Sequence, residues 1–185
     1  MCYYKLSCIK HRNLMEIYRT NISTKQRERQ AQMTIARTDT KLKIAVVFIG
    51  SHASGKTLFF ERYFSDAYTH IELSALRTRQ REKSALRQCY KHSDSFVADN
   101  PNLTPDDRAR YIPEAKEKGY RVIGYYFSMD ERIAEEMESA SPDKEMLRVY
   151  EKDMKKLRMP TIDEGFDELY KVTLTRGGDF KTEKL

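Results

Sequence analysis

The feature that most constrains this chain is an apolar run, Ile44–Ile49, that leads directly into Gly-Ser-His-Ala-Ser-Gly-Lys-Thr at residues 50–57. The run has the composition of a buried strand, and the amphipathic segment Leu58–Phe64 is expected to be helical. Glycines let such a loop wrap its backbone N–H groups around phosphates, and the helix that follows points its positive dipole end at the same anion. Strand, loop and helix together predict a phosphate-binding loop (P-loop) from Gly50 to Thr57.

Two residues at the end of this loop have predicted chemical roles. Lys56 is expected to reach the β- and γ-phosphates of ATP, and the Thr57 hydroxyl is expected to ligate Mg²⁺. His52 is predicted to be an ordinary loop residue, with contact to a phosphate or substrate as the alternative. The predicted cofactors are therefore ATP and Mg²⁺. The other residues expected to line the nucleotide are Gly50, Ser51, Ala53, Ser54 and Gly55.

The charge of the chain is unevenly distributed. The 185 residues carry a formal net charge of +6, and all of this excess lies in residues 1–42, which have nine basic against three acidic side chains. The remainder therefore has 34 − 9 = 25 basic and 28 − 3 = 25 acidic residues.

We expect a basic N-terminal extension at 1–42, a kinase-like domain at 43–175 and a C-terminal tail at 176–185. The extension is either a solvated, partly helical segment or a nucleic-acid-binding arm. The neutral net charge of the rest indicates no nucleic-acid groove, although local clustering of basic residues could make one.

The cysteines and the hydropathy predict a soluble cytoplasmic protein with no membrane partner. Cys2, Cys8 and Cys89 are odd in number and form no C-x-x-C pair, which argues against a disulfide framework or a structural zinc site. The longest apolar run is too short to span a bilayer.

Apolar runs alternate with amphipathic segments after Lys43, and this alternation predicts an α/β fold with a mostly parallel central sheet flanked by helices. The strands are expected at 44–49, about 70–73, 95–98, 121–127 and about 168–174.

One helix has clear end signals. Thr104 is expected to cap it, Pro105 suits its first position, and Asp107 completes a capping box. Gly119 is expected to end this helix, and Pro113 to kink it.

Asp99 lies at the carboxyl end of a predicted strand, where open α/β sheets bind ligands. A carboxylate there can hold Mg²⁺ through water and orient it on the phosphates, and a turn or helix cap is the alternative role. Asn100 and Asn102 either position substrate or complete the turn. Arg108 and Arg110 are expected to form surface or helix ion pairs.

Two further stretches resemble a known family. They are Asp-Asn-x-Asn at 99–102, followed by Arg-x-Arg-Tyr at 108–111, and Pro-Thr-x-x-Glu-Gly-Phe at 160–166. In this order after the P-loop, they resemble the kinase domain of polynucleotide kinase-phosphatase and the phage-type polynucleotide 5′-hydroxyl kinases. The resemblance extends from about Lys43 to Val172. It implies a P-loop NTPase fold with a helical lid and transfer of the ATP γ-phosphate to a hydroxyl, with a nucleic-acid 5′ end as the leading acceptor. A small hydroxyl metabolite or nucleotide as acceptor, and an ATP-binding module with impaired transfer, remain the alternatives.

The acceptor side departs from this family's pattern. The family's strand after the first helix ends in an Asp that takes the acceptor's proton, with a phosphate-binding Arg three residues later. Here Ser74 stands at the Asp position, while Arg77 retains the Arg. A serine hydroxyl is a poor proton acceptor near neutral pH. Glu72 is a candidate replacement, because strand alternation would place it on the same face as Ser74; a solvent-facing strand edge is the alternative.

The predicted lid is also unusual. The resemblance implies lid arginines around the transferring phosphate, but residues 130–144 are acidic and contain one arginine, Arg132, with Arg148 lying beyond them. The segment from Arg77 to Arg87 is basic. It is expected either to hold an acceptor phosphate or to form an ordinary solvated helix face.

Overall fold

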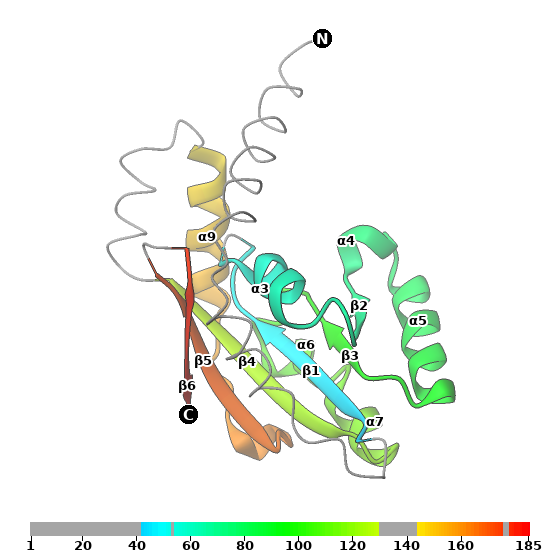
Figure 1. Ribbon diagram of the computed structural model, residues 1–185. Coiled ribbons are helices and arrows are strands. Elements are labelled where there is room, and N and C mark those ends of the chain that lie inside the picture. The colour runs from blue at the N-terminus through cyan, green and yellow to red at the C-terminus, as the bar shows by residue number, and fades with distance from the viewer. Residues whose placement is uncertain (1–41, 53, 130–143, 176–177) are drawn as a thin grey trace. The chain divides into compact units, whose positions relative to one another are not determined.

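The computed structural model describes residues 42–52, 54–129, 144–175 and 178–185 (Figure 1). The strands are β1 (Ile44–Ile49), β2 (Thr69–Ile71), β3 (Phe96–Ala98), β4 (Arg121–Met129), β5 (Glu168–Leu174) and β6 (Phe180–Lys184). The helices are α3 (Lys56–Tyr63), α4 (Leu73–Leu76), α5 (Arg79–His92), α6 (Pro105–Arg108), α7 (Ile112–Glu117) and α9 (Lys144–Lys156), with a 3₁₀ turn, η1 (Ile162–Glu164). The predicted N-terminal extension up to residue 41, and most of the predicted lid, 130–143, lie outside the described residues.

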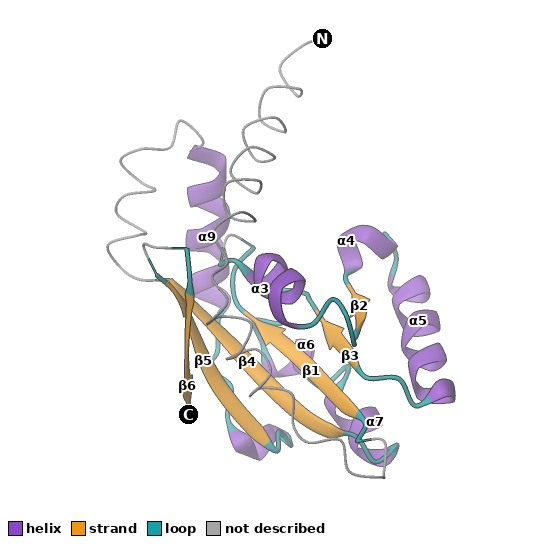
Figure 2. Cartoon of the chain, viewed as in Figure 1, coloured by secondary structure: helices purple, strands orange, loops and turns teal. Residues whose placement is uncertain are grey.

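The strands form one sheet in the order β2-β3-β1-β4-β5-β6 (Figure 2). β1 pairs in parallel with both β3 and β4, β2 pairs in parallel with β3, and β5 does so with β4. Only the last pair, β5 with β6, is antiparallel among the described strands. The prediction of an α/β fold with a mostly parallel sheet is therefore confirmed.

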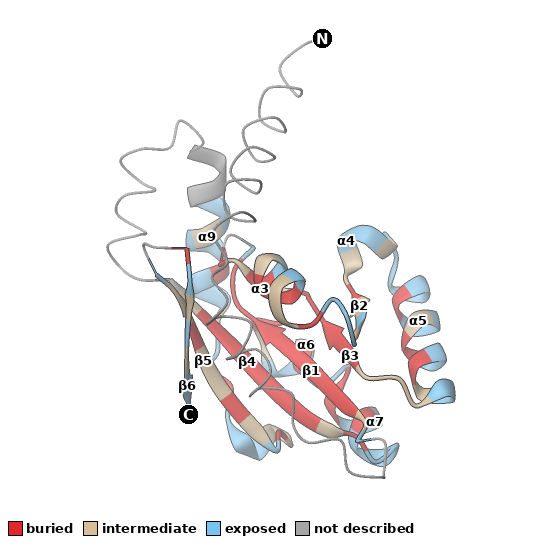
Figure 3. Ribbon diagram, viewed as in Figure 1, coloured by how far each residue is buried: buried red, intermediate tan, exposed pale blue. Residues whose placement is uncertain are grey.

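β1 lies at the centre of this sheet, and all of its residues are buried (Figure 3). Val46 faces Val97 of β3 on one side and Ile123 of β4 on the other. A parallel strand covered on both faces reads as a continuous apolar run rather than an alternating one. This explains why Ile44–Ile49 was recognisable in the sequence.

Successive residues of β1 point to opposite faces of the sheet, and each face has its own core. On one face, the ring of Phe48 packs against the α3 ring of Phe59 with the centroids 5.8 Å apart. On the other face, Ile49 belongs to a core with residues of α5 and α7, including Leu86 and Ile112. The sheet is thus the middle of three layers, and the carboxyl end of β1 is held from both sides.

The predicted strands agree with the structure except near residue 72. The strand expected at 95–98 starts at Phe96, and the one expected at 121–127 extends to Met129. The strand expected at about 70–73 was wrong at its end, because the chain leaves the sheet after Ile71 and Leu73 begins α4. The Leu73 N–H donates to the side-chain oxygen of Asn100 at 2.9 Å instead of extending the strand.

The helix predicted from Thr104 to Gly119 is two helices. The capping box is confirmed, since Asp107 N donates to the Thr104 hydroxyl and Thr104 N donates to the Asp107 carboxylate. However, the chain breaks after α6 and restarts as α7. Pro113 lies in the first turn of α7, where a residue without an N–H breaks no helical hydrogen bond. A kinked single helix was therefore the wrong prediction.

The segment assigned to a C-terminal tail contains β6, an edge strand of the sheet. Phe180 lies against α3, with its ring centroid 5.0 Å from that of Phe59. β6 is charged and short, as edge strands often are, so its sequence carries little apolar signal. Within the described residues, none of the helices has the length and apolar content needed to cross a membrane.

Candidate functional site

The candidate site lies at the carboxyl ends of β1 and β3, two adjacent strands of the sheet. Residues 50–57, of which Ala53 lies outside the described residues, follow β1 and lead into α3, as Figure 1 shows, and Asp99 follows β3. The predicted arrangement of strand, loop and helix is therefore present. Ligands of open α/β sheets bind at this end of the strands.

The two glycines of the loop adopt backbone conformations that other residues avoid. Gly50 has φ 153° and Gly55 has φ 83°. A side chain at Gly50 would also meet Phe127, whose Cβ and carbonyl oxygen would lie 3.0 Å from the added Cβ. Gly50 N donates to the Pro101 carbonyl at 2.9 Å, which ties the loop to the chain that follows β3.

Lys56 points back into the loop that precedes it. Its side chain is buried, and its ammonium donates to the carbonyl of Gly50 at 3.0 Å and to that of Ser51. Burial lowers the pKa of Lys56 from 10.5 to about 8, an effect that the nearby carboxylates of Asp99, Asp153 and Glu72 partly oppose. The loop thus places a desolvated ammonium among three carboxylates.

Thr57 and Asp99 meet at the start of α3. The Thr57 hydroxyl donates to Asp99 Oδ2 at 2.9 Å, and the Asp99 side chain is almost completely buried. His70 of β2 places Nε2 2.9 Å from the same oxygen and stacks on the Phe60 ring, with centroids 3.8 Å apart. His70 was missed by the sequence analysis; its signal was a polar residue in a short strand next to the one that leads to Asp99.

These oxygen atoms fit Mg²⁺. Hydroxyl and carboxylate oxygens are the ligands that Mg²⁺ prefers, and it usually retains waters and binds through one or two protein groups plus substrate phosphates. Among the described residues, no group of three or more His, Cys, Asp or Glu side chains is arranged to hold a metal ion. Thr57 and Asp99 therefore suit an ion that arrives with a nucleotide, rather than a metal bound by protein alone.

A second missed residue is Asp153, which reaches the same loop from α9. Its Oδ2 accepts from the Ser51 hydroxyl at 3.2 Å and from His52 N at 3.4 Å, and lies 2.9 Å from His52 Nδ1. Asp153 is buried although the residues before and after it are exposed. His52, predicted to be an ordinary loop residue, therefore has a specific acidic neighbour.

At the start of α4, the structure brings Glu72 and Ser74 together, but not by strand alternation. Glu72 is the residue before α4, Ser74 lies in its first turn, and the Ser74 hydroxyl donates to Glu72 Oε1. Arg77 ends α4 in a left-handed conformation, φ 68°. Its side chain is exposed, and within the described part of the chain its guanidinium forms no hydrogen bond or ion pair.

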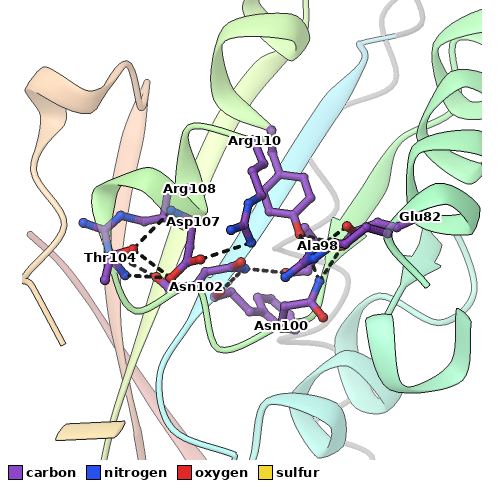
Figure 4. Close-up of polar contacts among 11 residues, drawn as sticks. Glu82, Ala98, Asn100, Asn102, Thr104, Asp107, Arg108 and Arg110 are labelled. Carbon is purple, nitrogen blue, oxygen red and sulfur yellow. Dashed lines mark hydrogen bonds and ion pairs between the residues drawn. The ribbon is translucent and has the colours of Figure 1, made fainter. Parts of the chain in front are cut away.

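A buried polar network fixes α4 and α5 to the segment after β3 (Figure 4). Glu82 of α5 is buried and accepts from Asn100 Nδ2 at 3.0 Å and from the Tyr111 hydroxyl at 2.7 Å. Its other oxygen accepts from Arg79 at 2.7 Å. Asn100 also accepts the Leu73 N–H. The residue after Asp99 thus joins the segment that follows β3 to α4 and α5.

The family-like stretches meet in the structure at Arg108. Its guanidinium is completely buried and donates to Glu164 Oε1 at 2.7 Å and to the carbonyls of Asn102 and Arg158, each at 3.1 Å. The expectation of a surface ion pair was wrong for Arg108. It holds for Arg110, which is exposed and lies 3.1 Å from Asp107.

Asn102 has a structural role in the same region. Its side-chain amide donates to the Phe48 carbonyl at 2.8 Å and to the Ala98 carbonyl at 3.3 Å. These bonds join the ends of β1 and β3, as Figure 4 shows in part. The one arginine of the predicted lid segment, Arg132, lies outside the described residues, and Arg148, beyond that segment, is exposed on α9.

The chain matches no protein-family model. Solved structures similar to it include one from the PezAT chromosomal toxin-antitoxin system of Streptococcus pneumoniae, at 13% identity over 88% of this chain and 82% of that one, with a TM-score of 0.48. A gluconokinase from Sinorhizobium meliloti 1021 is 17% identical over 74% of this chain and 86% of its own, with a TM-score of 0.48. Kti12 of Chaetomium thermophilum, solved with ADP-AlF3, is 14% identical over 72% of this chain and 92% of its own, also with a TM-score of 0.48. These likenesses are too distant to assign a function.

Proposed function

We propose that this protein is an ATP-dependent kinase that binds Mg-ATP on residues 50–57 and transfers the γ-phosphate to a hydroxyl acceptor. The observation that carries this proposal is the hydrogen bond between Thr57 and Asp99 beside a buried Lys56. Phosphoryl transfer by a P-loop protein uses three groups beside the glycine loop. They are an ammonium, a hydroxyl and a carboxylate, here those of Lys56, Thr57 and Asp99.

The roles of these residues follow from their chemistry. The backbone N–H groups of the loop and the start of α3 would bind the phosphates. Lys56 would exchange the carbonyls of Gly50 and Ser51 for phosphate oxygens. Thr57 and Asp99 would hold Mg²⁺, which when bound neutralises charge on the phosphates. Most of the rate enhancement would come from positioning and charge stabilisation, with no covalent enzyme intermediate.

We propose a polynucleotide 5′-hydroxyl as the acceptor, and the surface of α5 supports this choice. Between residues 77 and 92 the only acidic side chain is Glu82, which is buried. The exposed basic side chains of this stretch are Arg77, Arg79, Arg81, Lys83, Arg87 and Lys91. We call this exposed set the α5 basic face. The residues from 43 to 185 are formally neutral as a whole, so such a concentration next to α4 suits a polyanion.

Glu72 is the residue we propose as the proton acceptor. It accepts a hydrogen bond from the Ser74 hydroxyl, and Ser74 stands in the sequence where the resembling kinases have their Asp. Replacing Glu72 by Gln keeps the size and removes the basicity. Acceptor-dependent turnover should fall about 100-fold or more while ATP binding remains. Unchanged turnover would remove Glu72 from the mechanism.

The proposed function is tested by transfer of labelled γ-phosphate from Mg-ATP to a 5′-hydroxyl oligonucleotide, with Lys56→Ala as the control variant. Labelling that depends on Lys56 would support the kinase and its acceptor. Labelling of small hydroxyl compounds, but not of the oligonucleotide, would favour the small-acceptor alternative. ATP binding without transfer to either would favour a binding module, the alternative that Ser74 in place of an Asp suggests.

A further inference from the structure

The contact between α9 and the P-loop joins residues about a hundred positions apart in the sequence. Asp153 Oδ2 is the common acceptor for the Ser51 hydroxyl and His52 N, and it lies beside the His52 ring. The neighbours Lys152 and Met154 are exposed. Among the described side chains of α9, Asp153 is therefore the one whose hydrogen bonds link the helix to the loop.

The position of Asp153 relative to Lys56 indicates where its charge acts. Lys56 donates to the Ser51 carbonyl, and Ser51 is also a partner of Asp153. Asp153 is one of three carboxylates that act electrostatically on the Lys56 ammonium. In a P-loop the lysine binds the β- and γ-phosphates of the nucleotide. The Asp153 charge thus acts on the region that the terminal phosphates of a nucleotide would enter.

A buried carboxylate needs donors, and here the donors belong to the loop itself. Asp153 and an incoming phosphate would therefore compete for the hydrogen-bond donors of the P-loop. The two negative charges would also repel each other strongly in a partly buried site. The γ-phosphate adds negative charge that ADP lacks, so this repulsion discriminates between the two nucleotides.

The attachment of α9 does not depend on Asp153 alone. Immediately after α9, Arg158 N donates to the Leu103 carbonyl at 2.8 Å, and the Arg158 carbonyl accepts from Arg108. Leu157 packs against the core. The C-terminal end of the helix thus has anchors of its own, in addition to the link that Asp153 makes to the loop.

We propose that Asp153 is a specificity-determining residue of the nucleotide site, an internal anion that leaves Ser51 and His52 when a triphosphate binds and that lowers affinity for ATP more than for ADP. This rests on the proposed binding of ATP to the loop. Binding would couple the γ-phosphate to the position of α9 through one side chain.

The test uses the full chain and compares the dissociation constants of ATP and ADP for the wild type, Asp153→Asn and Glu151→Gln. Asn keeps the size of the side chain and removes its charge. Glu151→Gln removes the same charge from an exposed position on α9 and is the matched control. Asp153→Asn should bind ATP about five- to tenfold more tightly, with a smaller gain for ADP, whereas Glu151→Gln should change neither by more than about twofold.

A second measurement does not depend on affinity. Hydrogen exchange at residues 148–156 should increase on addition of ATP to the wild type and respond less to ADP. Unchanged or weaker ATP binding by a folded Asp153→Asn, or equal gains for ATP and ADP, would overturn the assignment. If the wild type binds neither nucleotide, both the proposed function and the role of Asp153 are overturned. Lys56→Ala is the control for nucleotide binding elsewhere than on the P-loop.

Discussion

Thr57 and Asp99 are joined by a hydrogen bond of 2.9 Å between the first turn of α3 and the end of β3, although 42 positions separate them in the sequence. The bond exists because β3 lies directly beside β1, so the residue after one strand faces the helix that follows the other. Asp99 Oδ2 also lies 2.9 Å from His70 Nε2. One buried carboxylate oxygen, Asp99 Oδ2, therefore connects β2, β3 and α3 at the carboxyl ends of the strands.

This connection predicts that Asp99 is needed for the effect of magnesium on nucleotide binding. In Asp99→Asn, Mg²⁺ should no longer strengthen ATP binding, and phosphoryl transfer should fall by about 100-fold or more, because the ion loses a charged anchor. Titration of a fluorescent ATP analogue with and without Mg²⁺ measures the first effect. A variant that keeps the full magnesium effect would show that Asp99 only caps the turn.

The lowered pKa of Lys56 predicts a pH dependence of nucleotide binding. The ammonium binds phosphates, and burial lowers its pKa to about 8, so ATP affinity should be constant below about pH 7 and fall as the pH rises through 8. If only the ammonium form binds, the dissociation constant rises about tenfold between pH 7 and 9. Lys56→Arg stays charged over this range and should show no such dependence.

The contribution of Lys56 to folding stability should rise with pH, whereas ATP affinity falls. Between pH 8 and about 10.5 the unfolded chain binds more protons at this lysine than the folded chain does, so the Lys56 contribution makes stability rise with pH. Loss of ATP binding in this window would therefore not be explained by unfolding through Lys56. A urea titration at each pH separates the two effects.

The buried ion pair of Arg108 and Glu164 predicts a large difference between two neighbouring arginines. Arg108→Ala leaves the Glu164 carboxylate without its partner and two carbonyls without a donor, which should lower the free energy of unfolding by about 3–5 kcal/mol. Arg110→Ala removes an exposed ion pair with Asp107 and should cost less than about 1 kcal/mol. Urea unfolding of the two variants measures both values. Similar losses would contradict a structural role specific to Arg108.

The arrangement of strand, loop and helix at the proposed nucleotide site could be predicted because its signals are local. Residues 44–57 contain the strand, the two glycines, the lysine and the threonine in one continuous stretch, and β1 is apolar throughout because both of its faces are buried. Asp99 was found in the same way, from its place at the end of an apolar segment. These inferences needed no knowledge of contacts between distant residues.

The residues that were missed all act through distant contacts. Asp153 meets Ser51 from 102 positions away, and nothing in the sequence of α9 distinguishes it from the solvated acids around it. Glu82 lies in a basic segment and is buried only because Asn100 and Tyr111 are brought to it. The strand through Glu72 was predicted too long for a related reason, since the side chain that ends it comes from Asn100.

The α5 basic face predicts a salt-dependent acceptor site. Exchanging Lys83 and Arg87 for Gln should raise the KM for a 5′-hydroxyl oligonucleotide about tenfold and leave the KM for ATP unchanged, because neither side chain belongs to the P-loop. The dependence of the logarithm of affinity on the logarithm of salt concentration should become shallower by up to about 2, because each removed cation leaves about one phosphate without its neutralising partner. Lys118→Gln, an exposed charge after α7, is the matched control and should behave as the wild type. If the KM for the oligonucleotide changes neither with salt concentration nor with these substitutions, the acceptor is not a polyanion. The proposed ATP site would be unaffected by that result, and a small hydroxyl compound would be the next acceptor to test.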